Sequence, residues 1–186
     1  MLKAVKGDPT RIFHKVVVLV SLFIIIITTV YGVTMSILNG VEVVGQTFID
    51  VEFPPIHVFP LFYMKPITWL NLAILLMAYS LLELNKERIS QFSRFKFHFL
   101  KFGAFLVAAL ALYEVLFNFT LWSGLIAADS ILGKLNPDVI INPFPNPKLP
   151  WNIVFATKLY LAATIVGLYM FFFLTRIETA LSKTNV

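Results

Sequence analysis

Four long apolar runs decide what this chain can fold into. They cover about residues 16–38, 63–84, 99–128 and 151–174. A helix needs roughly 20 apolar residues to cross the hydrocarbon core of a bilayer, and each run reaches that length. In lipid the backbone has no water to bond with, so a helix is the expected structure for each run. The chain is therefore predicted to be all-α, with an integral membrane four-helix transmembrane bundle as a single domain over residues 1–186.

The composition agrees with a chain that dissolves in lipid. Hydrophobic residues make up 59% of it and charged residues 13%, against about 45–50% and about 25% in soluble domains. The net charge of +5 would favour an acidic partner in a soluble protein. No polar domain remains here to bind nucleic acid, so the expected partner is the lipid bilayer. The absence of cysteine excludes disulfides, thiolate catalysis and cysteine-bound metals.

The basic residues indicate how the spans are oriented. Most of the 15 Lys and Arg residues precede the first span, lie in or beside a basic inner loop at 85–98, or follow the fourth span. Loops rich in Lys and Arg stay in the cytoplasm, so both termini are expected there, in a multi-pass protein of the cell membrane. The even number of spans agrees with this orientation. The residues concerned are Lys3, Lys6, Arg11, Lys15, Lys86, Arg88, Arg94, Lys96, Lys101, Arg176 and Lys183.

Two longer connections, 39–62 and 129–150, are expected to form ordered extracytoplasmic loops. In the first, apolar and acidic residues alternate, which is a strand pattern. Gly45–Gln46 is placed to turn a hairpin between Val41–Val44 and Thr47–Phe53. The second connection is rich in proline, which favours extended chain over helix. We expect the two loops to pack together as a small cap.

Aromatic and basic side chains are interleaved where the inner loop runs into the third span. Phe residues at helical spacing insert among acyl chains, while Lys and Arg reach anionic headgroups. The same residue types also occur in nucleic-acid sites, but an apolar span follows directly here. We therefore predict an interfacial, lipid-facing helix that carries Phe92, Phe95, Phe99, Arg94, Lys96 and Lys101.

Four polar residues are predicted to lie inside the membrane. Glu114 is near the middle of the third run, and Asn118 is one turn away on the same helix face. Asn71 in the second run and Lys158 in the fourth are expected at comparable depths, ~10–15 Å from the outer end at a rise of ~1.5 Å per residue. A carboxylate at such a depth must meet protein, water or a partner charge rather than lipid.

This polar cluster has three interpretations. The side chains line a pathway, in which Glu114 and Lys158 would have coupled titrations. Alternatively they hold the helices of the chain together through interhelical polar contacts. In the third interpretation Glu114 meets a charge on another subunit. The residue types alone do not choose among these three.

No motif for catalysis, a cofactor or a metal occurs in the sequence. The histidines His14, His57 and His98 lie on different segments, and the expected topology puts His57 on the side opposite the other two. One metal hypothesis remains, a site that another subunit completes at His57, beside Asp50 and Glu52. A Gly-rich phosphate loop, H-E-x-x-H and G-x-S-x-G are all missing. We therefore expect no catalytic residue, no metal ligand and no cofactor.

These observations favour a non-catalytic accessory or structural subunit of a larger membrane complex, such as an energy-transducing, oxidoreductase or monooxygenase assembly. Its partners would be other membrane subunits or further copies of the chain. The alternative function is a small proton or polar-solute transporter or channel that uses Glu114 and Lys158. An intramembrane enzyme comes third, because the sequence offers no nucleophile–base pair.

Overall fold

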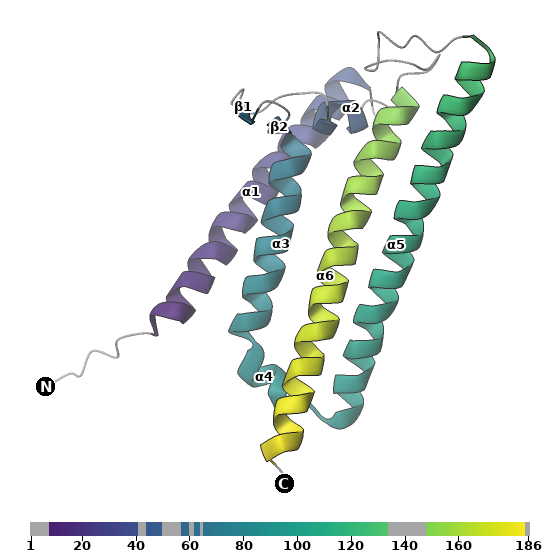
Figure 1. Ribbon diagram of the computed structural model, residues 1–186. Coiled ribbons are helices and arrows are strands. Elements are labelled where there is room, and N and C mark those ends of the chain that lie inside the picture. The colour runs from purple at the N-terminus through teal and green to yellow at the C-terminus, as the bar shows by residue number, and fades with distance from the viewer. Residues whose placement is uncertain are drawn as a thin grey trace, which may run out of the picture.

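The computed structural model describes residues 8–40, 44–49, 57–59, 62–63, 65–133 and 148–184 (Figure 1). These residues are almost wholly helical, with one short two-stranded sheet. In chain order the elements are α1 (Pro9–Asn39), α2 (Val44–Ile49), β1 (His57–Phe59), β2 (Phe62–Tyr63), α3 (Pro66–Leu84), α4 (Lys86–Ser90), α5 (Arg94–Ile131) and α6 (Lys148–Thr184).

Four of these helices, α1, α3, α5 and α6, are long and apolar enough to cross a membrane, which confirms the four predicted spans. α5 has 38 residues and α6 has 37. At ~1.5 Å per residue each is about 55 Å long, well beyond the hydrocarbon core of ~30 Å. Both helices therefore continue past their apolar runs. The inner loop predicted at 85–98 is mostly helical, because α4 and the start of α5 occupy it.

Local sequence signals set where the spanning helices begin. Asp8 caps α1 by accepting a hydrogen bond from the backbone N–H of Thr10 at 3.1 Å, and Pro9 takes the first helical position. Pro66 likewise takes the first helical position of α3, and the side chain of Ser93 caps α5. Proline is tolerated at these positions because a first-turn N–H has no partner within the helix. The starts of three spans are therefore encoded by their neighbouring residues.

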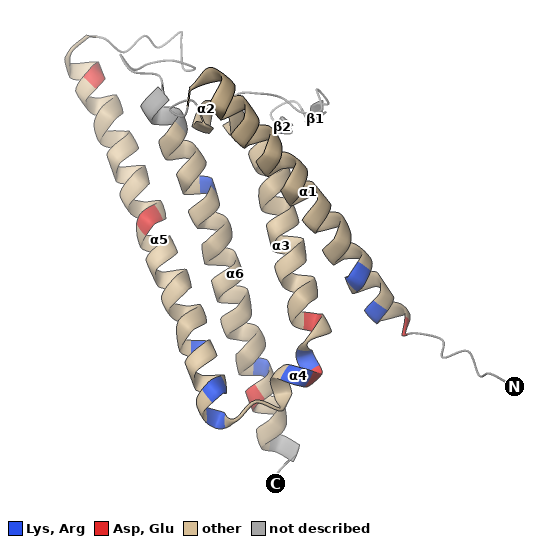
Figure 2. Cartoon of the chain, turned by 180° about the vertical axis from the view of Figure 1, so that it is seen from behind, with Lys and Arg blue, Asp and Glu red and all other residues tan. Residues whose placement is uncertain are grey.

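The long helices of the predicted four-helix bundle form an open row in the order α1–α3–α6–α5. α5 packs chiefly on α6 and α1 chiefly on α3, while α3 and α6 join the two pairs. Figures 1 and 2 show this order from opposite sides. The end helices α1 and α5 carry many exposed large apolar side chains. Lipid tails are as apolar as these side chains, so burying them within the chain brings little gain.

Small residues of α1 line its contacts with the neighbouring helices. Ser21, Thr28, Gly32 and Ser36 are all buried, and Gly32 lies against Phe48 of α2. The hydroxyl of Thr28 donates a hydrogen bond to the carbonyl of Ile24 at 2.7 Å, and that of Ser36 donates to the carbonyl of Gly32 at 2.7 Å. Small side chains allow two helices to approach closely. Hydroxyls that bond within their own helix leave no donor unpaired at the contact.

A second close contact joins α5 to α6. Ala104, Ala108 and Ala111 are buried on α5, and Gly167 is buried on α6. A Cβ atom at Gly167 would lie 3.0 Å from the carbonyl oxygen of Ala104 and 3.0 Å from both the backbone nitrogen and the Cβ of Ala108. Glycine therefore allows the two helix backbones to come this close.

The first connection predicted to be extracytoplasmic, residues 39–62, contains a helix where the sequence predicts a strand hairpin. Residues 44–49 form α2, so the predicted pairing of Val41–Val44 with Thr47–Phe53 is wrong. The hairpin that does form pairs β1 with β2 antiparallel, with His57 opposite Tyr63. The second outer loop falls largely at residues 134–147, outside the described residues. The expected cap of two packed loops lies outside them as well.

Tertiary packing explains why α2 is helical. The helix is wedged among α1, α3 and α6 at the end of the molecule opposite α4. Phe48 is only 4% exposed, and its ring centroid lies 4.9 Å from that of Phe155. The backbone N–H of Gly45 donates to Oδ1 of Asn152 at 2.8 Å. A helix satisfies its own backbone while it buries these groups, so burial outweighs the alternating pattern of the sequence.

Candidate functional site

Glu114 lies on α5 beside the surface that packs on α6. The buried residues Ala104, Ala108 and Ala111 and the half-buried Val115 follow one another at alternating steps of four and three residues. This spacing is typical of a helix that packs along one neighbour. Glu114 falls immediately next to that line and is itself half-buried. Its carboxylate is thus at the edge of the α5–α6 contact, in the middle of a span.

Within the part of the chain that the structure describes, the carboxylate of Glu114 has no hydrogen bond or ion pair. Asn118, one turn further along α5, is also half-buried and likewise has no partner there. Asp129, near the outer end of α5, is 7% exposed, and its Oδ2 atom has no hydrogen-bond partner among the described residues. The sequence placed Asp129 in the outer loop, whereas the structure places it in the helix. α5 therefore carries two carboxyl groups along one span.

Asn71 and Lys158 are brought together, but through the backbone. The side-chain Nδ2 of Asn71 on α3 donates a hydrogen bond to the main-chain carbonyl of Lys158 on α6 at 3.1 Å. The Oδ1 atom of Asn71 is buried and has no partner among the described residues. This contact ties α3 to α6 at the junction of the two helix pairs, as expected for polar side chains that hold spanning helices together.

The structure does not join the four predicted polar residues into one cluster. Gly167 meets Ala108, and from there Lys158 lies nine residues toward the outer end and Glu114 six. At ~1.5 Å per residue the two charged residues are within about one helical turn in height. No ion pair joins them in the described residues. The cluster is therefore divided into Asn71 with Lys158 at one contact, and Glu114 with Asn118 at another.

Most charged residues of the described chain lie toward the end of the molecule where α4 lies (Figure 2). There Lys101 Nζ on α5 lies 2.6 Å from Glu178 Oε2 on α6, and His98 Nδ1 lies 3.8 Å from Oε1 of the same carboxylate. The Lys101 ammonium also lies 5.7 Å from the ring centroid of Phe171. Lys101 was predicted to reach lipid headgroups, but the structure gives it a partner within the chain.

Sequence reasoning missed Glu178. The signal was present, because it is an acidic residue just beyond a span whose neighbouring inner loop is basic. Lys101 and Glu178 are 24% and 38% exposed. This ion pair joins α5 and α6 at the end of the molecule where α4 lies, in addition to the glycine contact deeper in the span.

The predicted interfacial residues are mostly at the surface. Phe95 is 78% exposed and Phe99 67%, with ring centroids 6.3 Å apart in a stacked arrangement. Arg94 and Lys96 are exposed too. Phe92 differs, because it is half-buried and packs against an apolar cluster that includes Phe97, Leu174 and Ile177.

A buried histidine contact near the N-terminal end of α1 also escaped the sequence reasoning. His14 is 7% exposed, and its Nδ1 lies 3.3 Å from the hydroxyl of the fully buried Ser80 on α3. The ring of Tyr79 meets the imidazole edge-on at 5.4 Å. Ser80 follows an apolar stretch, and its pairing with a residue 66 positions away has no local sequence signal.

The described residues contain no group of three or more His, Asp or Glu side chains arranged to hold a metal ion. The metal hypothesis at His57 involves Asp50 and Glu52, which lie outside the described residues. It therefore stays a prediction.

The four apolar helices support a multi-pass membrane protein. Comparison of the chain with protein-family models, with curated proteins and with solved structures gave no match.

Proposed function

We propose that this chain is a non-catalytic subunit of a hetero-oligomeric membrane complex, and that α5 is a helix through which it contacts its partner. The observation that carries this proposal is the half-buried carboxylate of Glu114, which has no partner within the described residues. An acidic side chain at the centre of a spanning helix is unfavourable by about 2.5–3.5 kcal/mol on insertion scales. A cationic or hydrogen-bonding side chain from another chain would offset this penalty.

The position of α5 in the row supports the proposal. α5 packs chiefly on α6, so its other sides are available to a neighbour. Tyr113 and Phe117, which flank Glu114, are 61% and 52% exposed. Their rings stack with centroids 6.3 Å apart. Aromatic side chains next to one charge form a surface that a second membrane helix with a complementary charge would fit. Of the three interpretations of Glu114, this arrangement favours the contact between subunits.

The transporter alternative receives less support. It requires Glu114 and Lys158 to act in one pathway, yet no ion pair joins them in the described chain, and Asn71 bonds to the backbone of Lys158. An open row of helices also needs further copies or other subunits before it can surround a solute. The proposed orientation remains the one that the basic residues indicate, with both termini in the cytoplasm of a cell membrane protein.

Native mass measurement of the protein, purified from its own membranes in mild detergent, tests the proposal. We expect a complex of defined mass that contains the chain and at least one different membrane subunit. Glu114→Gln preserves the shape of the side chain and removes its charge, so the variant should lose the partner while its own helices stay folded. Glu87→Gln is the matched control, because Glu87 is exposed on α4. Recovery of the wild-type chain as a monomer or simple homodimer would refute the subunit role.

A further inference from the structure

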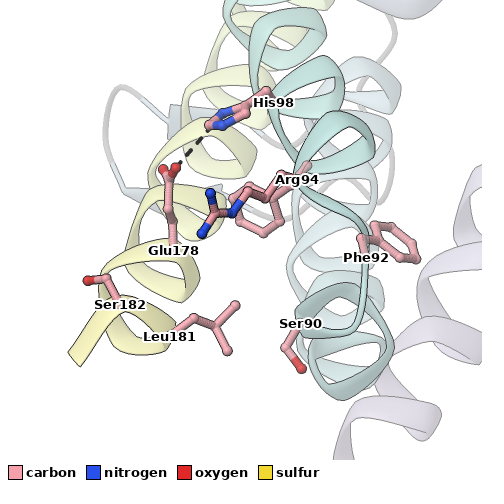
Figure 3. Close-up of a pocket in the computed structure, with 8 residues that line it drawn as sticks. Ser90, Phe92, Arg94, His98, Glu178, Leu181 and Ser182 are labelled. Carbon is pink, nitrogen blue, oxygen red and sulfur yellow. Dashed lines mark ion pairs between the residues drawn. The ribbon is translucent and has the colours of Figure 1, made fainter. Parts of the chain in front are cut away.

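A hollow of about 500 Å³ opens at the inner end of the molecule, between the α4–α5 turn and the last turns of α6 (Figure 3). Its lining includes Ser90 from α4, Arg94 and His98 from α5, and Glu178 and Ser182 from α6. Figure 3 shows the Arg94 side chain reaching from α5 toward α6, close to Glu178. Polar groups from three helices therefore converge on one site.

Of the charged side chains that line this hollow, Glu178 has partners within the described chain and Arg94 has none. The carboxylate of Glu178 is engaged by Lys101 at 2.6 Å and faces His98 at 3.8 Å. Arg94 forms no hydrogen bond or ion pair within the described residues, and it is exposed. Its guanidinium is therefore the group available to an anion. A guanidinium presents paired donors whose spacing matches the oxygens of a phosphate.

The two serine hydroxyls define what else a ligand must offer. Ser90 donates its proton to the carbonyl of Glu87 at 2.7 Å, and Ser182 donates to the carbonyl of Thr179 at 2.9 Å. Each hydroxyl has a single proton, so both oxygens are left as acceptors. The site thus suits a ligand with anionic oxygens for Arg94 and hydroxyl donors of its own.

The surroundings indicate that such a ligand would come from the membrane. Phe95 and Phe99 lie on the first turns of α5, are largely exposed, and form a stacked apolar surface beside Arg94. Arg94 is seven residues before Lys101, hence ~10 Å further from the apolar run of α5. This distance puts the guanidinium at the level of lipid headgroups, and the ring of Phe99, five residues and hence ~7.5 Å further along α5, at the level of the upper acyl chains.

We propose that this hollow binds the headgroup of an anionic phospholipid whose phosphodiester is followed by free hydroxyls. Arg94 binds the phosphate, Ser90 and Ser182 accept hydrogen bonds from the headgroup hydroxyls, and Phe95 and Phe99 contact the acyl chains. This inference goes beyond the proposed subunit role, because it concerns the inner end of the molecule and does not involve Glu114.

Lipid retention by the full-length protein tests the inference. Detergent-purified protein is supplied with phosphatidylglycerol or phosphatidylcholine, and bound lipids are counted by native mass spectrometry. We expect selective retention of phosphatidylglycerol. Arg94→Gln should weaken it roughly fivefold or more, since one basic residue near a membrane surface contributes about 1 kcal/mol. Arg88→Gln is the matched control, because Arg88 is exposed on α4 and does not line the hollow.

Two results would overturn the inference. Equal retention of the two lipids by the wild-type protein would mean that the hollow does not recognise the headgroup, and equal losses in both variants would mean that only general charge matters.

A competition with inorganic phosphate needs no variant and separates a lipid from a soluble anion. We expect phosphate to displace the lipid no better than chloride at equal ionic strength. Displacement specific to phosphate would reassign the hollow to a soluble ligand.

Discussion

Individual polar residues of this chain differ in whether the fold gives them a partner. His14 meets Ser80, and Asn71 holds the backbone of α6, so both support contacts between helices. Glu114 has no such contact within the described residues. Because water is absent from the hydrocarbon core, an unmatched polar group there is more costly than on the surface of a soluble protein. The difference separates residues that maintain the fold from one that is suited to binding another chain.

Ser80→Ala tests the first of these roles. Ser80 is fully buried, and its loss leaves Nδ1 of the buried His14 without its hydrogen bond. Leaving such a group unpaired lowers the free energy of unfolding by about 1–3 kcal/mol. Thermal or denaturant unfolding in detergent measures the change. Ser123→Ala serves as control, since Ser123 is exposed and bonds only to the carbonyl of Phe119 in its own helix. Similar stabilities for the two variants would contradict the role of the His14–Ser80 contact.

At the scale of the helices, two close contacts determine how the spans pair. α1 meets α3 along small residues such as Ser21 and Thr28, and α5 meets α6 at Ala104, Ala108 and Gly167. Dispersion between closely spaced backbones is a main source of attraction between helices in lipid. The interfaces therefore depend on the absence of side-chain volume.

Gly167→Leu is expected to separate α5 from α6. Even a Cβ atom there would lie 3.0 Å from backbone atoms of α5, and a larger side chain has no room. Overpacking of this kind lowers the free energy of unfolding by about 1–3 kcal/mol. Gly103→Leu is the matched control, because a Cβ at Gly103 meets nothing within 4 Å. Reversible unfolding in detergent compares the two variants. Equal stability would show that the close contact contributes little.

The sequence predicted where the helices lie better than it predicted which helices pack together. Apolar runs locate the spans, because length and hydropathy are local properties, and Pro66 and Ser93 mark helix starts directly. The row of helices was not predicted, since lipid and protein are equally apolar surroundings for a Phe or Ile side chain. The alternating residues before Pro54 suggested a strand, and only the packing of Phe48 beside Gly32 reveals α2.

In the candidate site, too, residues with a local sequence signal were predicted and contacts that depend on tertiary packing were not. Glu114 was found because a charge inside an apolar run is visible in the sequence alone. The ion pair with Lys158, which only one of the three interpretations involves, does not occur among the described residues. The side on which each residue projects depends on how α3, α5 and α6 pack. Glu178 and Ser80 have partners 77 and 66 residues away. Contacts at such separations come from tertiary structure.

At the scale of the whole molecule, the first described residues of α1 and the last of α6 lie at the same end as α4 (Figure 1). The basic residues lead us to expect this end in the cytoplasm. The chain has no cysteine of its own, so a thiol reagent can label only a cysteine that is introduced. We expect a membrane-impermeant thiol reagent to label Ser130→Cys from outside the cell and Gln91→Cys only after the membrane is opened. Both positions are exposed. Labelling of Gln91→Cys in intact cells would reverse the orientation.

The order α1–α3–α6–α5 has a consequence for how the protein is made. α5 leaves the ribosome before α6, yet its principal neighbour in the finished molecule is α6, which lies between α3 and α5. During biogenesis the third span must therefore wait in the membrane without its principal neighbour until the last span arrives. A chain interrupted before Lys148 would retain the α1–α3 pair and leave the third span without the helix on which it chiefly packs.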